Sequence, residues 1–555
     1  MESRPVNEKK PHIIIFNPDE MRADTLAHLG NPAAVTPNLD QMAREDGVSF
    51  RHAFCQNPVC VPSRCSFFTG LYPHVNGHRT MSYLLRPGED SLLKELKEAG
   101  YYVWMNDRND LTAGQYEGWT EEHADRIFYG GGRKPAPGPV DPHIRGERGS
   151  KHYYSHFRGQ LRTDDQGLNY TFDDEAVDEA CRLIREWKED RPLCIFLGLM
   201  YPHTPYQVEE PYFSAIDRKK LPRRIRPEDC GGKPRMEEMI RSYQNLESFD
   251  ENDWDELRAV YQGMCMKVDE QFGRLRDAMK EAGIYDNSVI FFFSDHGDYT
   301  GDYGLVEKAQ NCFEDCLTRV PFLIKPPKDS KVSPGIRDGL VELVDFYATA
   351  MDYAGVAPSH TQFGRSLRHA LKDPDCELRP CVFCEGGRMP GEEHCDEYHG
   401  ENGQAAVENS EYWPKQVSQK EDLAHAKGIM IRDQRYKYIS RTMGCDELYD
   451  LKEDPGETHN RIEDPRLSGE LARLQTAMLK WLQSTADIVP YDMDRRFTAE
   501  GMWSRVRDMV PPEYEAEVRK KIQEGIRLAP LGEYCRKLTG KKAAAGKGVQ
   551  GGSPE

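Results

Sequence analysis

The stretch His12-Ile13-Ile14-Ile15-Phe16 is the first of several short apolar runs that alternate with helix signals. Similar runs occupy residues 101–105, 193–199 and 288–293, and segments with helical patterns lie at 36–47, 91–99, 173–190, 252–283 and 341–354. Continuous apolar strands that alternate with helices predict an α/β fold with a mostly parallel sheet sandwiched by helices. Such sheets bind ligands at the carboxyl ends of their strands, so the polar residues after these runs are candidate site residues.

The pattern changes after a Gly- and Glu-rich loop at 386–409. Short strands at 428–431, 436–439 and 447–451, followed by a helix at 467–482, predict a smaller antiparallel α+β domain. We therefore predict an N-terminal domain over residues 1–375, the small domain over 376–486, a helical extension over 487–540 and a flexible tail over 541–555. The extension could cap a substrate mouth, pair subunits or pack on the surface.

Composition excludes several classes of protein. The 555 residues include 93 Asp and Glu against 74 Lys and Arg, a net charge of −19, which argues against a nucleic-acid partner. No apolar run approaches the roughly 18 residues of a membrane span, and the first residues show no signal peptide. Fifteen cysteines without framework spacing favour reduced thiols. We expect a globular cytoplasmic protein without a membrane partner.

The most specific motif is Cys60-Val61-Pro62-Ser63-Arg64, followed by Thr69-Gly70. Pro62 favours the start of a helix, whose free N–H groups and dipole would favour an anion near residue 60. The motif resembles the signature of the type I, formylglycine-dependent sulfatase family of the alkaline phosphatase superfamily. The resemblance implies an alkaline-phosphatase-like fold, with residues 1–375 as the catalytic domain. It also implies that a formylglycine-generating or anaerobic sulfatase-maturing enzyme oxidises Cys60 to formylglycine, whose hydrate is the nucleophile.

Two further motifs match the metal ligands of that family. Asp19 follows the first strand at the position of its first acidic ligand, and Glu20 replaces the usual Asp or Gln with an acid one methylene longer than Asp. Asp295 and His296 follow the run at 288–293, and residue 60 would complete the shell. Acidic oxygens with one imidazole suit Ca²⁺, or alternatively Mg²⁺ or Mn²⁺.

The resemblance assigns the remaining candidates to sulfate binding and catalysis. Arg64 would hold the modified residue and Lys308 would contact a sulfate oxygen. His203, in Pro202-His203-Thr204-Pro205, would contact the sulfate and serve the leaving oxygen.

A fourth expected motif, Gly-Lys-x-His-Leu, is altered to Asp107-Arg108-Asn109-Asp110-Leu111. Arg108 can replace the lysine as a sulfate ligand. Asp110 stands in place of a cationic histidine, so it would either orient Arg108 or accept a hydrogen bond from a substrate hydroxyl. Asp110 and His78 are our candidate substrate-binding residues.

These motifs predict a sulfuric ester hydrolase that acts on a sulfated small molecule, in particular a sulfated carbohydrate. The insertion at 128–162 holds seven basic and two acidic residues, which suits an acidic sugar. Two alternatives stay open. One is a phosphonate monoester or phosphodiester hydrolase of the same superfamily, and the other is a catalytically silent carbohydrate-binding relative with unmodified Cys60.

Overall fold

The computed structural model of the protein describes residues 10–131, 138–165, 167, 169–397, 408–489 and 496–546. The chain divides into two compact units, of which the first ends at Ile488 and the second begins at Val489. Each unit is described by itself.

The first unit is built on a large sheet that, within the described residues, has the strand order β11-β2-β10-β8-β1-β6-β3-β4, with β9 paired to β2. Strand β1 lies between β6 and β8 and is parallel to both, and β3 is parallel to β6. Only β10 runs antiparallel to both of its neighbours along this path. The predicted mostly parallel sheet is therefore confirmed. Its strands are β1 (His12–Asn17), β2 (Val48–Phe54), β3 (Tyr102–Asn106), β4 (Arg126–Phe128), β6 (Leu193–Gly198), β8 (Ser288–Phe293), β9 (Arg319–Val320), β10 (Phe322–Lys325) and β11 (Gly335–Glu342).

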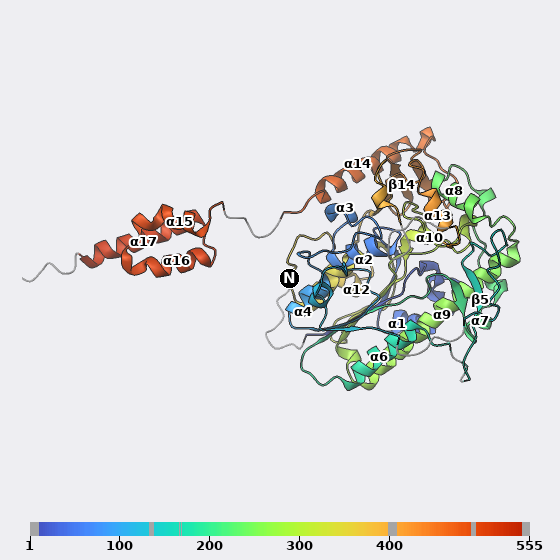
Figure 1. Ribbon diagram of the computed structural model, residues 1–555, viewed down its shortest axis with the longest axis horizontal. Helices are drawn as coiled ribbons and strands as arrows, with labels where there is room; N and C mark the ends of the chain where they lie inside the picture. The colour runs from blue at the N-terminus through green and yellow to red at the C-terminus, as the bar shows by residue number, and fades with distance from the viewer. Residues whose placement is uncertain are drawn as a thin grey trace, which may run out of the picture. The chain divides into compact units, whose positions relative to one another are not determined.

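Helices cover both faces of this sheet (Figure 1). In β1, Ile14 and Phe16 are buried in the core on one face, whereas Ile13 and Ile15 are buried in the core on the other. Burial on both faces explains why the strand is continuously apolar. The first face is covered by α1 (Pro37–Glu45), α6 (Phe172–Glu186) and α9 (Glu251–Glu281), and the second by α2 (Cys60–Thr69), α4 (Leu92–Glu98) and α11 (Val344–Ala354).

Strands β2, β10 and β11 were not predicted from the sequence. Strand β2 carries Arg51 and His52, and β11 carries Arg337 and Asp338, so neither forms a continuous apolar run. Pairing between β2 and β11 extends to Glu342, which is why the helix predicted from residue 341 begins only at Val344. Cross-strand pairing decides β2 and β11, and it is not visible in a local pattern.

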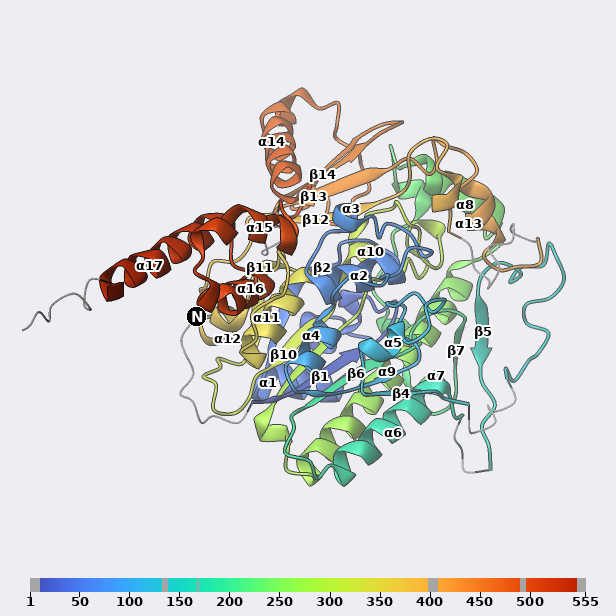
Figure 2. The ribbon, with the colours of Figure 1, turned by 60° about the vertical axis from the view of Figure 1, so that its left-hand side comes forward.

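The first unit also contains a small antiparallel sheet, against which α14 (Ser468–Thr485) packs (Figure 2). The predicted antiparallel α+β region is thus present. Its inner side chains, among them Val382, Met430 and Ile439, share the core of the large sheet. Because of this shared core, the boundary that we predicted at 375/376 is a change of sheet inside one compact unit. The strands are β12 (Val382–Gly386), β13 (Gly428–Arg432), β14 (Tyr436–Arg441) and β15 (Glu447–Asp450). A separate parallel pair is formed by β5 (Phe157–Gln160) and β7 (Tyr206–Val208).

The second unit contains α15 (Ala499–Val506), α16 (Glu515–Gln523) and α17 (Leu528–Gly546) within its described residues. These helices enclose a small core of their own, which includes Met502, Ile522 and Leu531. Helix α17 continues past residue 540, where we predicted a flexible tail to begin, because the Lys and Ala residues there are strong helix formers. Residues 547–555 of that predicted tail lie outside the described residues.

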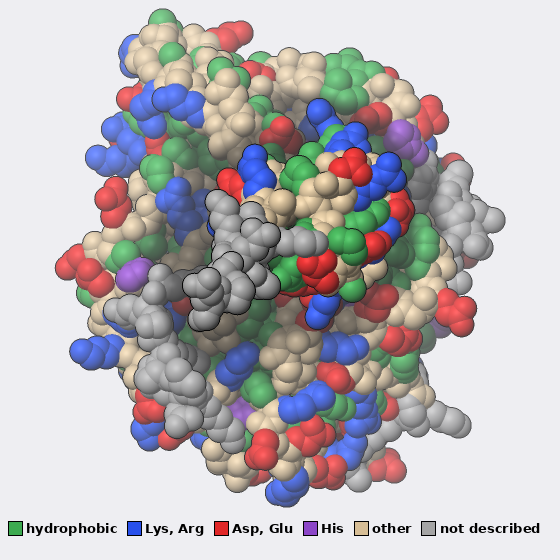
Figure 3. All heavy atoms as spheres, turned by 90° about the vertical axis from the view of Figure 1, so that its left-hand side faces the viewer, with side chains coloured by type: hydrophobic (Ala, Val, Ile, Leu, Met, Phe, Trp, Pro, Cys, Tyr) green, Lys and Arg blue, Asp and Glu red, His purple; other side chains and the backbone are tan. Residues whose placement is uncertain are grey.

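The charges on one face and the cysteine side chains can be compared with the composition. Acidic and basic side chains are intermixed on the face drawn in Figure 3, so neither sign of charge dominates that face. All fifteen cysteines are free thiols. Among the described helices, none combines the length and the apolar character needed to cross a membrane.

Candidate active site

Four neighbouring parallel strands bring the predicted site residues to one edge of the sheet. The order β8-β1-β6-β3 places their carboxyl ends side by side. The side chains that follow these ends are Asp295 and His296 after β8, Asp19 and Glu20 after β1, His203 after β6, and Arg108 and Asp110 after β3. The sheet topology therefore gathers motifs that lie almost 300 residues apart, as expected for a ligand site of an α/β sheet.

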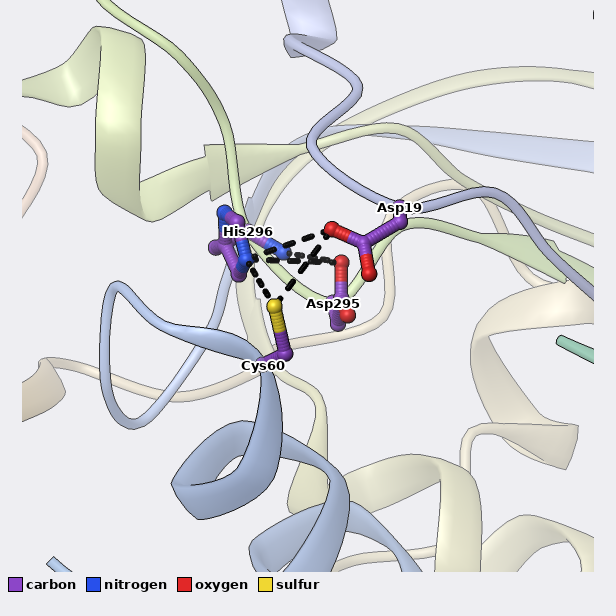
Figure 4. Close-up of side chains that lie close together, drawn as sticks. All are labelled: Asp19, Cys60, Asp295 and His296. Carbon is purple, nitrogen blue, oxygen red and sulfur yellow. Dashed lines mark hydrogen bonds and ion pairs between the residues drawn. The ribbon is translucent and has the colours of Figure 1, made fainter. Parts of the chain in front are cut away.

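Cys60 is the first residue of α2 and points into this group of side chains (Figure 4). Its Sγ atom lies 3.2 Å from His296 Nε2 and 3.5 Å from Asp19 Oδ1, and only 2% of the residue is exposed. Burial and the charge of Asp19 raise the pKa of the thiol well above its usual value. Burial therefore disfavours the thiolate form of Cys60 when no cation is bound.

Arg64 lies one turn further along α2 and is wholly buried. Its Nε donates to Asp295 Oδ2 at 2.9 Å, and its Nη2 donates to Asp19 Oδ2 at 2.8 Å. We predicted that Arg64 holds the side chain of residue 60. In the structure its planar fork connects two carboxylates and so fixes the acidic residues. A contact of Arg64 with the modified residue 60 stays a prediction.

Glu20 has an unusual backbone and an unpaired oxygen. Its φ angle is +67°, a region that costs a non-glycine residue about 1–3 kcal/mol. Its N–H donates to Asp295 Oδ1 at 3.2 Å, and its carbonyl accepts from the Tyr261 hydroxyl at 2.7 Å, so the conformation is fixed from both sides. Glu20 Oε1 is buried without a hydrogen-bond partner. Burial raises the pKa of this carboxyl well above its usual value although Lys308 opposes the shift.

Four side chains of the site could together bind a divalent cation. Asp19, Cys60, Asp295 and His296 each offer one ligand atom, and these atoms lie within 4.8 Å of one another (Figure 4). His296 Nδ1 is hydrogen-bonded to the Gly297 carbonyl at 2.9 Å, which directs Nε2 toward the acids. Two of the four ligand atoms are carboxylate oxygens. Glu20, whose Oε1 is buried without a hydrogen-bond partner, forms a second candidate group with Asp19 and His203. Such a set suits Ca²⁺, Mg²⁺ or Mn²⁺.

A second group surrounds Lys308. Its Nζ lies 2.9 Å from His203 Nε2, 3.2 Å from Glu20 Oε2 and 2.8 Å from Glu307 Oε1. Burial and the neighbouring ammonium of Lys308 lower the pKa of His203 well below its usual value, so the imidazole is neutral in the free site. Glu307 was missed in the sequence analysis, because a Glu next to a site lysine carries no signal of its own. Its φ angle of +65° is a structural indication of a constrained position.

Arg108 and Asp110 lie on the solvent side of the site. Arg108 Nη1 donates to Asp19 Oδ2 at 2.8 Å and to the Leu199 carbonyl at 3.3 Å. Asp110 Oδ2 lies 3.8 Å from Nη1 of both Arg64 and Arg108. The side chain of Asp110 is 34% exposed and that of Arg108 is 21% exposed, whereas Asp19 is fully buried. A substrate would therefore approach from the side of Arg108 and Asp110.

His78 does not join these residues. Its Nδ1 lies 2.8 Å from the Tyr83 carbonyl, and its Nε2 lies 3.1 Å from Glu89 Oε1. Both ring nitrogens are therefore used by neighbouring residues of the chain. Our prediction of His78 as a substrate-binding residue is corrected accordingly, since no ring nitrogen is left for a ligand.

The basic insertion is also used differently from our expectation. Lys151 pairs with Asp253, and Arg158 pairs with Glu411 at 2.8 Å. Arg145 and Arg148 likewise bond to residues 408 and 409, and Arg133 and Lys134 lie outside the described residues. Arg162, by contrast, is exposed and donates to the Val140 carbonyl within the insertion. Most of the described cations therefore hold other segments of this chain and are not collected into an open surface for a polyanion.

Comparison with known proteins identifies the family. A family model described as Sulfatase matches residues 11–356, so the chain belongs to the sulfatase family. The multifunctional alkaline phosphatase superfamily protein PehA of Trinickia caryophylli is 23% identical over 86% of this chain and 96% of its own length. The N-acetylglucosamine-6-O-sulfatase of Bacteroides thetaiotaomicron is 24% identical over 86% of each chain. The crystal structure of a phosphonate monoester hydrolase of Agrobacterium radiobacter matches with a TM-score of 0.63 and 22% identity over 86% of this chain and 96% of that chain.

Proposed function

We propose that the protein hydrolyses O-sulfate esters by means of a formylglycine formed from Cys60 and a bound divalent cation, with Ca²⁺ as the first candidate. One observation carries this proposal most directly. The side chain of residue 60 meets Asp19, Asp295 and His296 at the start of a helix, next to buried Arg and Lys side chains. This arrangement suits an anionic ester whose attacked centre lies close to both residue 60 and a cation.

Each residue of the site would have a separate role in this reaction. Asp19, Asp295, His296 and Glu20 would hold the cation, and Arg64 would keep the first two acids in place. Arg108 and Lys308 would stabilise negative charge on the sulfate. When present, the cation would polarise a sulfate oxygen, and the hydrate at residue 60 would supply two hydroxyls on one carbon, one to attack sulfur and one to release sulfate. Water is consumed overall, and an alcohol and sulfate are released.

The proposal also requires a maturing enzyme as a partner, either formylglycine-generating or anaerobic. Because residue 60 is only 2% exposed, this partner would act on the segment before α2 is buried. Carbohydrate is our proposed substrate class. It is supported by the name of the N-acetylglucosamine-6-O-sulfatase relative, and by Asp110, a partly exposed carboxylate near the site that can accept hydrogen bonds from sugar hydroxyls.

Three esters with the same aryl leaving group test the reaction: an aryl sulfate, an aryl phosphate and an aryl phosphonate monoester. We expect the sulfate to have the highest kcat/KM. The phosphonate ester carries the same single charge as the sulfate, so it is the stringent competitor, and the match to a phosphonate monoester hydrolase structure makes it the second candidate. Preferred turnover of the phosphonate would replace our proposal. Binding of sulfated sugars without any turnover, with Cys60 unmodified, would support the silent carbohydrate-binding alternative.

His203→Ala should separate substrates by leaving group. Lys308 holds a proton 2.9 Å from His203 Nε2, so this pair is placed to deliver a proton to the departing oxygen. We expect a loss of about 10²-fold or more with a sugar or alkyl sulfate, and a much smaller loss with an activated aryl sulfate, whose leaving group needs no proton. Steady-state kinetics on both substrates measure the difference. Equal losses would assign His203 to sulfate binding or to structure.

Asp110→Asn tests the two roles predicted for this residue. If Asp110 binds a sugar hydroxyl, the variant should lose about tenfold in kcat/KM on the saccharide and little on an aryl sulfate. If Asp110 orients Arg108, both substrates should lose activity alike. Asp107→Asn changes an exposed carboxylate in the same loop and is the matched control. Unchanged kinetics on both substrates would exclude Asp110 from substrate binding.

A further inference from the structure

A row of alternating buried charges leads from the active site into the C-terminal part of the first unit. Lys308 Nζ lies 3.2 Å from Glu20 Oε2 and 2.8 Å from Glu307 Oε1. On the far side of Glu307, Lys415 Nζ lies 2.8 Å from Glu307 Oε2 and 2.9 Å from Glu397 Oε1. None of these five side chains is more than 6% exposed. At such burial each charge depends strongly on its direct neighbours, because water screens little.

Lys415 belongs to α13 (Trp413–Ser418), more than 100 residues from Lys308 in the chain, and α13 is firmly held. The Trp413 ring stacks on Tyr154 at 5.7 Å and meets Tyr243 edge-on at 5.3 Å. The Glu397 carbonyl accepts from Gln419 Nε2 at 3.0 Å, which fixes the other partner of Lys415. The Lys415 ammonium is therefore positioned by packing and not by its two carboxylates alone.

Glu307 shares its charge between two ammonium groups, one on each oxygen. Without Lys415, the only ammonium left beside Glu307 in these ion pairs would be that of Lys308. The buried carboxylate would then draw Lys308 more strongly to itself, away from Glu20 Oε2 and His203 Nε2. An uncompensated buried charge is costly enough to cause such a shift, or to destabilise the local structure.

We propose that Lys415 is a positioning residue, which neutralises Glu307 so that the Lys308 ammonium is free to contact the sulfate group of the ester. This inference rests on the proposed sulfate ester hydrolysis for its catalytic consequence. Its structural part is that Lys415, in a distant segment, controls the position of the Lys308 ammonium. This part can be tested with inorganic sulfate alone.

Lys415→Met should lower kcat/KM for an aryl sulfate by about 10²-fold, the usual loss when a preorganised charge is misplaced. Lys415→Arg keeps the charge and should stay within about fivefold of the parent enzyme. The double variant Glu307→Gln/Lys415→Met also loses the opposing charge. Its kcat/KM should be about tenfold higher than that of Lys415→Met, because the pair is then neutral again. Lys420→Met is the matched control: Lys420 lies in the same segment, is 47% exposed and pairs with Asp396.

A double-mutant cycle distinguishes positioning from a general structural role. In a Lys308→Ala background, Lys415→Met should change kcat/KM by less than about twofold, because its target is already absent. A full additional loss in that background would overturn the inference. Lys415→Met is replaced in this test if thermal unfolding shows that it does not fold. In that case Glu307→Gln/Lys415→Met is compared with Glu307→Gln, once with Lys308 present and once with Lys308→Ala. With Lys308 present, these two variants should have the same kcat/KM, because Lys415 acts through Glu307. A double variant that is about tenfold or more below Glu307→Gln would overturn the inference.

Binding of inorganic sulfate provides a readout that needs neither turnover nor modified Cys60. In Cys60→Ala protein, calorimetry should find that Lys415→Met weakens sulfate binding about tenfold, or 1.4 kcal/mol, and that Lys420→Met leaves it unchanged. If Lys415→Met binds sulfate as tightly as its parent, the inference is contradicted, whether or not the protein hydrolyses sulfate esters. Absence of ester hydrolysis by the parent protein would refute the proposed function and leave this binding result interpretable.

Discussion

Cys60→Ala should abolish turnover of every sulfate ester while the fold stays intact. The residue packs among Asp19, Asp295 and His296 at the start of α2, and an alanine fits that space without adding charge or volume. Loss of the nucleophile removes the reaction path itself, so we expect a decrease of about 10⁴-fold or more, limited by the assay background. Steady-state kinetics and thermal unfolding of the same preparation measure activity and fold separately.

Cys60→Ser makes this prediction sharper. A serine hydroxyl could accept sulfate once, but it has no second hydroxyl on the same carbon to expel it, so at most one turnover is expected. Cys65→Ala is the matched control, because Cys65 is a buried thiol of the same helix, and its Sγ lies 4.0 Å from the Leu111 carbonyl. Cys65→Ala should retain activity at reduced stability. Multiple turnovers by Cys60→Ser would exclude the hydrate mechanism.

Asp19→Ala should remove both the bound cation and the activity. Asp19 binds Arg64 and Arg108 through Oδ2 and belongs to the metal group. Its loss deprives the cation of a charged ligand, and removes one of the two carboxylates bound by Arg64 and the closest carboxylate of Arg108. The guanidinium groups would then repel the cation as well. Burial would raise the pKa of Asp19, but the nearby cations, led by Arg108, outweigh it and hold the pKa well below its usual value. The ligand is therefore charged throughout the working pH range.

We expect Asp19→Ala to lose about 10³-fold or more in kcat and to contain less than a tenth of the parent's metal by elemental analysis. Asp24→Ala is a suitable control, since Asp24 lies in the same loop, is 45% exposed and pairs with Arg22 outside the metal group. Chelation of the parent protein should have the same effect as Asp19→Ala and should be reversed by added Ca²⁺. Full activity after exhaustive chelation would contradict the metal site.

Much of this site could be predicted from the sequence because its residues follow strands that are apolar throughout. The runs at 12–16 and 288–293 became β1 and β8, adjacent and parallel, which brings Asp19 and Asp295 together. Cys60 was placed at a helix start by Pro62, and α2 begins at Cys60 with Pro62 in its first turn. In each case a local pattern and a simple topological rule were sufficient.

The remaining features depend on contacts between distant segments. The sequence gives no sign that Arg64 connects two carboxylates, or that Lys415 and Glu307 form a buried pair. The basic insertion looked like a binding surface because its acidic partners, such as Glu411 and Asp253, lie far away in the chain. His78 looked available for the same reason, since Glu89 is brought to it only by the fold. The number of charges can be counted in the sequence, but the partner of each charge is known only from the structure.

The most direct test of the central claim is the mass of the peptide that contains residue 60, measured on active protein produced together with a maturing enzyme. We predict that residue 60 carries an aldehyde or its hydrate in place of the thiol, and that the modified fraction rises and falls with specific activity toward an aryl sulfate. A fully unmodified Cys60 in protein that turns over sulfate esters would contradict the account.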